Sequence, residues 1–158
     1  MSKEYRTLQA TVSLPYELAF GATLTRFFEG LSEEKILGTR CPRCTRVLVP
    51  ARTFCPRCFV DLDDWVEVAQ TGTVETWSLV SYEYLGMARK PPYITGLIRL
   101  EGADVGFTHL IGGIDMSSIE RVKSRLSIGT RVKAVWAREK PGSIFDIEHF
   151  IPLDGDTR

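Results

Sequence analysis

The chain has 158 residues, of which 44% are apolar and 25% are charged, and its 20 basic residues balance its 20 acidic residues. This composition is typical of a folded globular protein and argues against a disordered chain. The neutral net charge also excludes nucleic acid as the default partner, because phosphate backbones are bound by summed Lys and Arg charge.

The N-terminal segment is expected to be an arm and not a targeting signal. Residues 1–20 include Glu4, Pro15 and Glu17 and lack the unbroken apolar run of a signal peptide. No apolar run approaches the roughly 20 residues that a membrane-crossing helix requires. We therefore expect a cytoplasmic protein. Residues 1–37 are expected to form this arm, which becomes ordered only against a surface, and an amphipathic helix that follows it.

The stretch TLTRFFEGLSEEKIL, from Thr23 to Leu37, predicts that helix. Its apolar residues recur at the helical spacing i, i+3, i+4 and i+7, at Leu24, Phe27, Phe28 and Leu31. Either Thr23 or Thr25 can cap the first turn. The aromatic stripe must be covered, and two interpretations are open: the rest of the chain covers it, or another subunit does.

All four cysteines of the chain lie in the next segment, CPRCTRVLVPARTFCPRC. Cys41, Cys44, Cys55 and Cys58 form two C-x2-C units separated by ten residues, which is the spacing of a zinc ribbon. A cytoplasmic protein keeps its thiols reduced, so metal binding is favoured over disulfide formation. The duplication argues against a redox pair, which needs only one such unit. Residues 47–49 predict a short strand between the units.

A shell of four thiolates leaves no open position, so the predicted zinc is structural and not catalytic. Iron in a rubredoxin-like site is the alternative, because four sulfurs suit both metals. The residues after the two units, Thr45 and Phe59, stand where glycine is common, since a positive φ is easy for glycine. We expect the ribbon to span residues 38–64.

The ribbon is rich in arginine. Between Gly38 and Val60 no acidic residue accompanies Arg40, Arg43, Arg46, Arg52 and Arg57. With the charge of about −2 carried by zinc and four thiolates, this segment has a net charge of about +3. It is either a solvated rim or a docking surface for an acidic partner or for ligand phosphates.

Residues 65–152 predict a five-stranded barrel, followed by a tail at residues 153–158. The segment 61–72 is a link, and the strands are expected at Gly72–Tyr82, Tyr93–Glu101, Val105–Ile111, Thr130–Glu139 and Ile144–Ile151. In the last strand, alternation places Phe145, Ile147 and Ile151 on one face and Asp146 and Glu148 on the other.

A helix is expected between the third and fourth strands, in DMSSIERVKSRL. It carries a capping box, Ser117-x-x-Glu120, and apolar residues at helical spacing. Five short strands with a helix in this place are the order of an OB-fold barrel. The predicted fold class is therefore mainly β, with an N-terminal helix, a rubredoxin-like ribbon and an OB-fold.

No catalytic set is visible in the sequence. By strand parity, His109 and His149 each fall on an apolar face, so both are expected to be core histidines. No serine, free cysteine or paired carboxylate is placed to use either one as a base. The segment IGGID lacks both the P-loop lysine and the dinucleotide-binding spacing.

The order of an aromatic helix, a C-x2-C ribbon and an OB barrel resembles the acyl-CoA-associated family of zinc-ribbon/OB-fold proteins, long described as a domain of unknown function. The match is carried by RFFEGLSEEKILGTRCPRC, VLVPARTFCPRC, WVEVAQTGTVETWSLV, PPYITGLIRLEG and FTHLIGG. These segments extend over nearly the whole chain.

This resemblance implies an accessory subunit that is non-catalytic by itself and joins a thiolase-superfamily enzyme: a thiolase, a hydroxymethylglutaryl-CoA synthase or a steroid side-chain aldolase. It implies four cysteine ligands for structural zinc and a role in thiolytic or retro-aldol cleavage of an aromatic, steroid or fatty acyl-CoA. The candidate partner interface is Phe27, Phe28, Arg43 and Arg57.

The resemblance also implies a CoA site shared with the partner. Arg89 and Lys90, in the loop between the first two barrel strands, are the candidates for contacts with CoA phosphates. The alternative function, from a different class, is a module that binds single-stranded nucleic acid, since ribbons and OB-folds also do this.

Overall fold

The structure is a computed structural model that describes residues 8, 15–84, 86–87 and 89–153. Its elements, in chain order, are α1 (Gly21–Ser32), β1 (Ile36–Arg40), β2 (Val47–Leu48), β3 (Asp64–Val68), β4 (Thr71–Val80), β5 (Tyr93–Leu100), β6 (Gly106–Ile111), α2 (Ile119–Arg125), β7 (Arg131–Trp136), the 3-10 helix η1 (Ile144–Asp146) and β8 (Ile147–Pro152). Most of the predicted arm lies outside the described residues; Leu8 and residues 15–20, which are described, are exposed. The predicted tail, apart from Leu153, also lies outside them.

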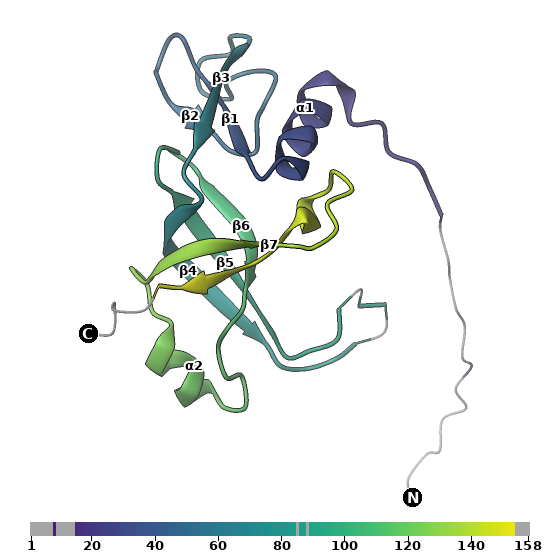
Figure 1. Ribbon diagram of the computed structural model, residues 1–158, viewed down its shortest axis with the longest axis vertical. Coiled ribbons are helices and arrows are strands. Elements are labelled where there is room, and N and C mark those ends of the chain that lie inside the picture. Colours follow the sequence, from purple (N-terminus) through teal and green to yellow (C-terminus); the bar gives the residue numbers. More distant parts are fainter. Residues whose placement is uncertain (1–7, 9–14, 85, 88, 154–158) are drawn as a thin grey trace, which may run out of the picture.

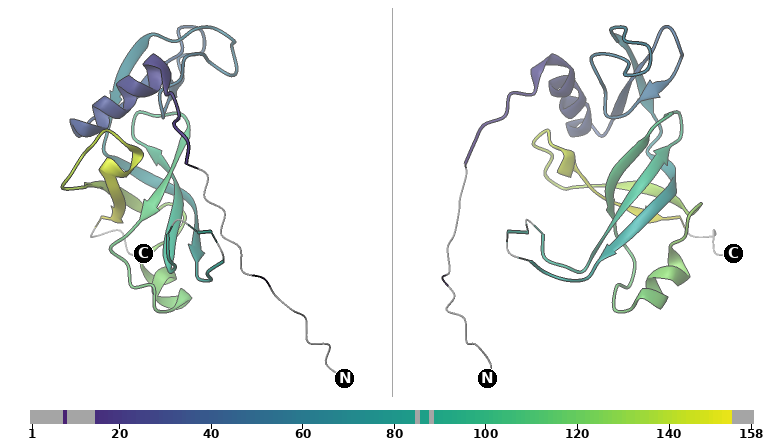
Figure 2. Two further views of the ribbon diagram at one scale, coloured as in Figure 1. Left: turned by 90° about the vertical axis from the view of Figure 1, so that its right-hand side faces the viewer. Right: turned by 180° about the vertical axis from the view of Figure 1, so that it is seen from behind.

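Two sheets make up the β-structure (Figure 1). A three-stranded sheet with the order β2-β1-β3 lies at one end of a closed barrel with the order β4-β5-β6-β8-β7. Helix α1 lies beside the small sheet, and α2 lies at the opposite end of the barrel in all views (Figures 1 and 2). With α2 between the third and fourth barrel strands, this is the OB-fold order, which confirms the predicted fold class.

Helix α1 begins at Gly21 without a side-chain cap. The predicted cap at Thr23 or Thr25 is therefore wrong: Phe20 holds the N-cap position, and the Thr25 hydroxyl donates to the Gly21 carbonyl at 2.7 Å. Packing takes the place of the cap, because most helix stability in proteins comes from a buried apolar face. Phe27, at the centre of that face, has no exposed surface.

The helix ends before Leu37, its predicted end. Glu34 adopts a left-handed conformation with φ 61°. The backbone N–H groups of Glu34 and Lys35 donate to the carbonyls of Leu31 and Gly30 at 2.9 and 2.8 Å. This pair of bonds is a Schellman motif, which usually has glycine at the left-handed position. The chain then turns directly into β1.

The segment 61–72 is not only a link, because it contains β3. This strand pairs antiparallel with β1 along its whole length, from Ile36 opposite Val68 to Arg40 opposite Asp64. The link interpretation is therefore wrong for the strand residues. The pattern is short and partly acidic, and its pairing partner lies more than twenty residues earlier, so the local sequence does not reveal the strand.

The four strands β4 to β7 match the predicted strands to within three residues at each end. Their inward residues form most of the barrel core, where Val74, Ile98, Phe107 and Val132 are buried. The alternation of buried and exposed positions in β5 and β6 follows the period of two on which the prediction was based.

Helix α2 forms in the predicted place, but its cap is shifted by one residue. The predicted capping box at Ser117 is wrong: the Ser118 hydroxyl oxygen accepts from the backbone N–H of Arg121 at 3.3 Å. Val122 and Leu126 are buried at the end of the barrel. Among the described residues, neither helix is long and apolar enough to cross a membrane.

The predicted last strand begins instead with η1. The Asp146 carboxylate accepts from the backbone N–H groups of Gly142 and Ser143 at 2.9 and 3.1 Å and is fully buried. This turn leaves Phe145 64% exposed. The predicted faces of the strand are therefore wrong at these positions, and Phe150 is the aromatic residue of β8 that enters the core.

Two sets of hydrogen bonds fix the small sheet to the barrel. The Val47 N–H donates to the Asp104 carboxylate at 2.8 Å, and the Asp104 N–H donates to the Val47 carbonyl at 2.9 Å. The Gln70 side chain donates to the Glu34 carbonyl at 2.7 Å and accepts from the Trp136 indole at 2.8 Å. These contacts hold the ribbon in a defined orientation on the barrel.

Candidate metal centre

Two turns bring the thiol groups of the chain to one place. Their four Sγ atoms all lie within 4.8 Å of one another and belong to Cys41, Cys44, Cys55 and Cys58. In each turn the residue after the second cysteine donates its N–H to the carbonyl of the first: Thr45 to Cys41 at 2.9 Å, and Phe59 to Cys55 at 2.8 Å. None of the four cysteines is in a disulfide bond.

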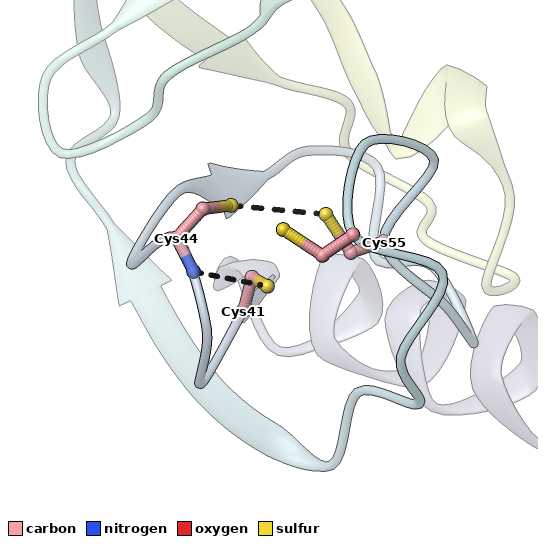
Figure 3. Close-up of side chains that lie close together, drawn as sticks. Cys41, Cys44 and Cys55 are labelled. Carbon is pink, nitrogen blue, oxygen red and sulfur yellow. Dashed lines mark hydrogen bonds between the residues drawn. The ribbon is translucent and has the colours of Figure 1, made fainter.

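The spacing of the sulfurs fits a tetrahedral metal ion. The Sγ atoms of Cys44 and Cys55 are 3.8 Å apart (Figure 3). Metal–sulfur bonds of about 2.3 Å give a tetrahedron with edges of about 3.8 Å. The Cys44 N–H also donates to the Cys41 Sγ at 3.4 Å, as the second dashed line shows (Figure 3). The four donors therefore fit structural zinc, with no position left for a substrate.

The thiol pKa values differ within the cluster. Burial raises the pKa of the Cys41 thiol, but the backbone N–H groups of Cys44 and Arg43 outweigh it and lower that pKa to about 6. Burial, followed by the neighbouring thiols, raises the pKa of Cys58 to about 12. A bound cation would remove this difference in protonation, because a metal ion deprotonates all the thiols that coordinate it.

The apolar cluster around the sulfurs is small. Its buried members are Cys41, Cys55, Leu48 and Leu62. Two leucines cannot offset the conformational entropy of ordering two turns, which costs about 1–2 kcal/mol for each backbone residue. A metal ion held by the four thiols would supply the folding energy of this part of the ribbon, as structural zinc does in small domains.

Both turns place a non-glycine residue in the left-handed region. Thr45 has φ 60° and Phe59 has φ 54°. The sequence marked these two positions as places where glycine is common, and the structure shows that both adopt the positive φ that glycine favours. Phe59 is also 82% exposed.

The ribbon arginines differ in their contacts. Arg40 forms an ion pair with Asp64 at 3.9 Å, and the Arg46 guanidinium donates to a barrel carbonyl at 3.4 Å. Arg43 and Arg57 are exposed at the two turns. Within the described part of the chain no ion pair includes Arg43 or Arg57.

The aromatic helix is covered mainly by the chain itself. Phe27 has no exposed surface and belongs to the main apolar core, so it is not available to a partner and its place in the candidate interface is wrong. Phe28 is half-buried and packs against that core, with its ring centroid 4.7 Å from that of Phe20, which is 46% exposed. Of the two predicted interface phenylalanines, only Phe28 reaches the surface.

The predicted CoA contacts lie away from the metal centre. Arg89 and Lys90 are exposed on the loop between β4 and β5, which projects from the barrel (Figure 2). Burial lowers the pKa of His109 below its ordinary value, although the hydrogen bond with the Ile144 backbone acts in the opposite direction.

The two histidines differ in burial. His109 is 7% exposed and its Nε2 lies 3.0 Å from the carbonyl oxygen of Ile144, so the predicted core position is confirmed for this residue. His149 is only half-buried, and its ring lies against the backbone of Gly112, where an added Cβ would come within 2.5 Å of a ring carbon. The core prediction is therefore wrong for His149.

Comparison with known proteins identifies the same two parts. Residues 28–64 match the family model described as the ChsH2 rubredoxin-like zinc ribbon domain, and residues 65–137 match the model of the ChsH2 C-terminal OB-fold domain. Together these adjoining matches extend over more than half of the chain.

Solved structures show the same fold. The chain is 26% identical, with a TM-score of 0.56, to a protein of unknown function from the DUF35 family of Sulfolobus solfataricus, over 73% of this chain and 78% of that one. It is 23% identical, with a TM-score of 0.63, to a chain of the Ltp2-ChsH2(DUF35) aldolase, over 86% of this chain and 98% of that one. The chain belongs to the ChsH2 family, in which a rubredoxin-like zinc ribbon precedes an OB-fold domain.

Proposed function

We propose that this protein is a non-catalytic accessory subunit of a thiolase-superfamily enzyme, and that it supports the cleavage of an acyl-CoA by that enzyme. The observation that carries the proposal is the family membership, together with the structural likeness to a chain of the Ltp2-ChsH2(DUF35) aldolase. In this assembly the partner supplies the catalytic residues, and this chain supplies a rigid surface and part of the acyl-CoA site.

The metal centre supports this role. Structural zinc held by four thiolates performs no chemistry on a substrate and makes the ribbon rigid. The hydrogen bonds of Asp104 and Gln70 then fix the ribbon to the barrel. A preorganised subunit loses little conformational entropy on binding, so more of its contact energy appears as affinity.

The first prediction concerns complex formation. Co-expression with a thiolase-superfamily enzyme of the same organism is expected to give a stable complex on size-exclusion chromatography, and the enzyme alone is expected to be less active. The isolated chain is expected not to cleave an acyl-CoA. Separate elution of two fully active proteins, or turnover by the isolated chain, would contradict the proposal.

The second prediction concerns the loop between β4 and β5. Replacing Arg89 and Lys90 together with alanine is expected to raise the Michaelis constant of the complex for acyl-CoA about tenfold, because charged hydrogen bonds to phosphate are lost. The turnover number is expected to change little. Lys123→Ala, on α2, removes an exposed cation from another part of the chain and is the control. Unchanged kinetics in the double variant would remove this loop from the CoA site.

A further inference from the structure

Phe59 combines an unfavourable backbone conformation with an exposed ring. Its φ of 54° lies in the left-handed region, which costs a residue with a side chain about 1–2 kcal/mol. The ring is 82% exposed, so burial within this chain does not offset that cost. Conformations of this kind cluster at functional sites, where another requirement maintains them.

The other turn of the metal centre is an internal comparison. Thr45 has the same φ to within a few degrees, at 60°, and closes its turn with the same backbone hydrogen bond. Its hydroxyl donates to the carbonyl oxygen of Cys44 at 2.7 Å, so its side chain has a local use. For Phe59 no ring or cation–π contact is found within the described residues. The metal-binding turn therefore does not require a phenylalanine.

The surface around Phe59 carries positive charge. Because all four Sγ atoms lie within 4.8 Å of one another, the two turns are side by side, and each carries one exposed arginine, Arg43 or Arg57. Between Cys41 and Val60 the sequence contains no acidic residue. Acidic residues begin again at Asp61, which forms an isolated β-bridge with Phe54 across the second turn.

We propose that Phe59, Arg43 and Arg57, here called the knuckle surface, dock onto the enzyme partner, with the ring of Phe59 entering an apolar pocket that has acidic residues at its rim. This inference rests on the proposed function. Aromatic residues and arginines are enriched among the residues that contribute most to interface affinity. The two arginines match an acidic rim in charge, and the metal holds all three side chains on rigid turns.

Glycine substitutions at the two matching positions test the proposal in the complex of full-length chain and enzyme. Phe59→Gly is expected to weaken binding at least tenfold in surface plasmon resonance, because the anchor is lost. It is not expected to lower the thermal midpoint of the isolated chain, because glycine tolerates the left-handed conformation. Thr45→Gly makes the same backbone change in the other turn and is expected to keep the wild-type affinity within twofold.

Charge reversal tests the second part of the knuckle surface. Arg43→Glu combined with Arg57→Glu is expected to slow association with the enzyme and to reverse its dependence on salt concentration, because salt then screens a repulsion. If this double variant associates with the enzyme at the wild-type rate, the proposed acidic rim is contradicted.

The outcomes separate this inference from the proposed function. If the wild-type chain does not bind the enzyme, both fail. If the wild-type chain and Phe59→Gly bind equally well, only the knuckle surface is overturned. If the isolated chain is a dimer by light scattering and Phe59→Gly makes it monomeric without changing enzyme binding, the occupant is a second copy and the inference is also overturned. In that case the apolar groove of about 410 Å³ between residues 20–24 and 51–54 of one copy would be the site that accepts the Phe59 ring of the other copy.

Discussion

Replacing Cys41 with serine is expected to abolish stoichiometric zinc binding and to unfold the ribbon. In zinc-binding peptides the metal contributes on the order of 10 kcal/mol to folding, far more than the small apolar cluster around the sulfurs can supply. We expect elemental analysis to find one zinc ion per wild-type chain and much less in the variant. The thermal unfolding midpoint should fall sharply, and binding to the enzyme partner should be lost.

The matched control for this variant is Thr45→Gly in the same turn. It removes an exposed side chain that is not a metal ligand, so its zinc content and unfolding midpoint should equal those of the wild type. A strong chelator should reproduce the effect of Cys41→Ser in the wild-type protein. Retention of one zinc ion and of the wild-type midpoint by Cys41→Ser would contradict the four-thiolate site. If the purified protein is red and contains iron, the resident metal is iron and not zinc.

Replacing Phe27 with alanine is expected to destabilise the protein by about 3–5 kcal/mol, because it removes a fully buried aromatic side chain and leaves a cavity. For a chain of this size the thermal midpoint should fall by roughly 10 °C. Differential scanning calorimetry measures this change. Any loss of enzyme binding should follow the loss of folded protein.

Phe20→Ala is the control for the helix surface, because Phe20 precedes the helix and is 46% exposed. We expect it to change stability by less than about 1 kcal/mol. If Phe27→Ala left the unfolding midpoint unchanged but abolished binding to the enzyme, Phe27 would be a partner contact and its burial in the core would be wrong.

The features that the sequence predicted are those that depend on local spacing. Two residues between paired cysteines allow both thiols of a unit to turn toward one point, so Cys41 and Cys44 indicate a metal site without knowledge of the fold. The strands β4 to β7 were predicted because alternation reports which side of a strand is buried. The glycine-like positions of Thr45 and Phe59 also follow from the turn alone.

The features that the sequence did not predict depend on residues far apart in the chain. Strand β3 forms because β1 offers it a partner, and Asp104 holds β2 although the two are separated by more than fifty residues. No local pattern contains these partners.

The sequence by itself determined the four candidate metal ligands, the order of ribbon and barrel, and the family. Only the tertiary structure decided which aromatic residues are available to a partner: it buries Phe27 and exposes Phe59. The physical reason is that spacing describes the geometry within one element, whereas exposure depends on everything that packs against that element. Hydrophobic periodicity alone cannot distinguish a face covered by its own chain from a face left for another protein.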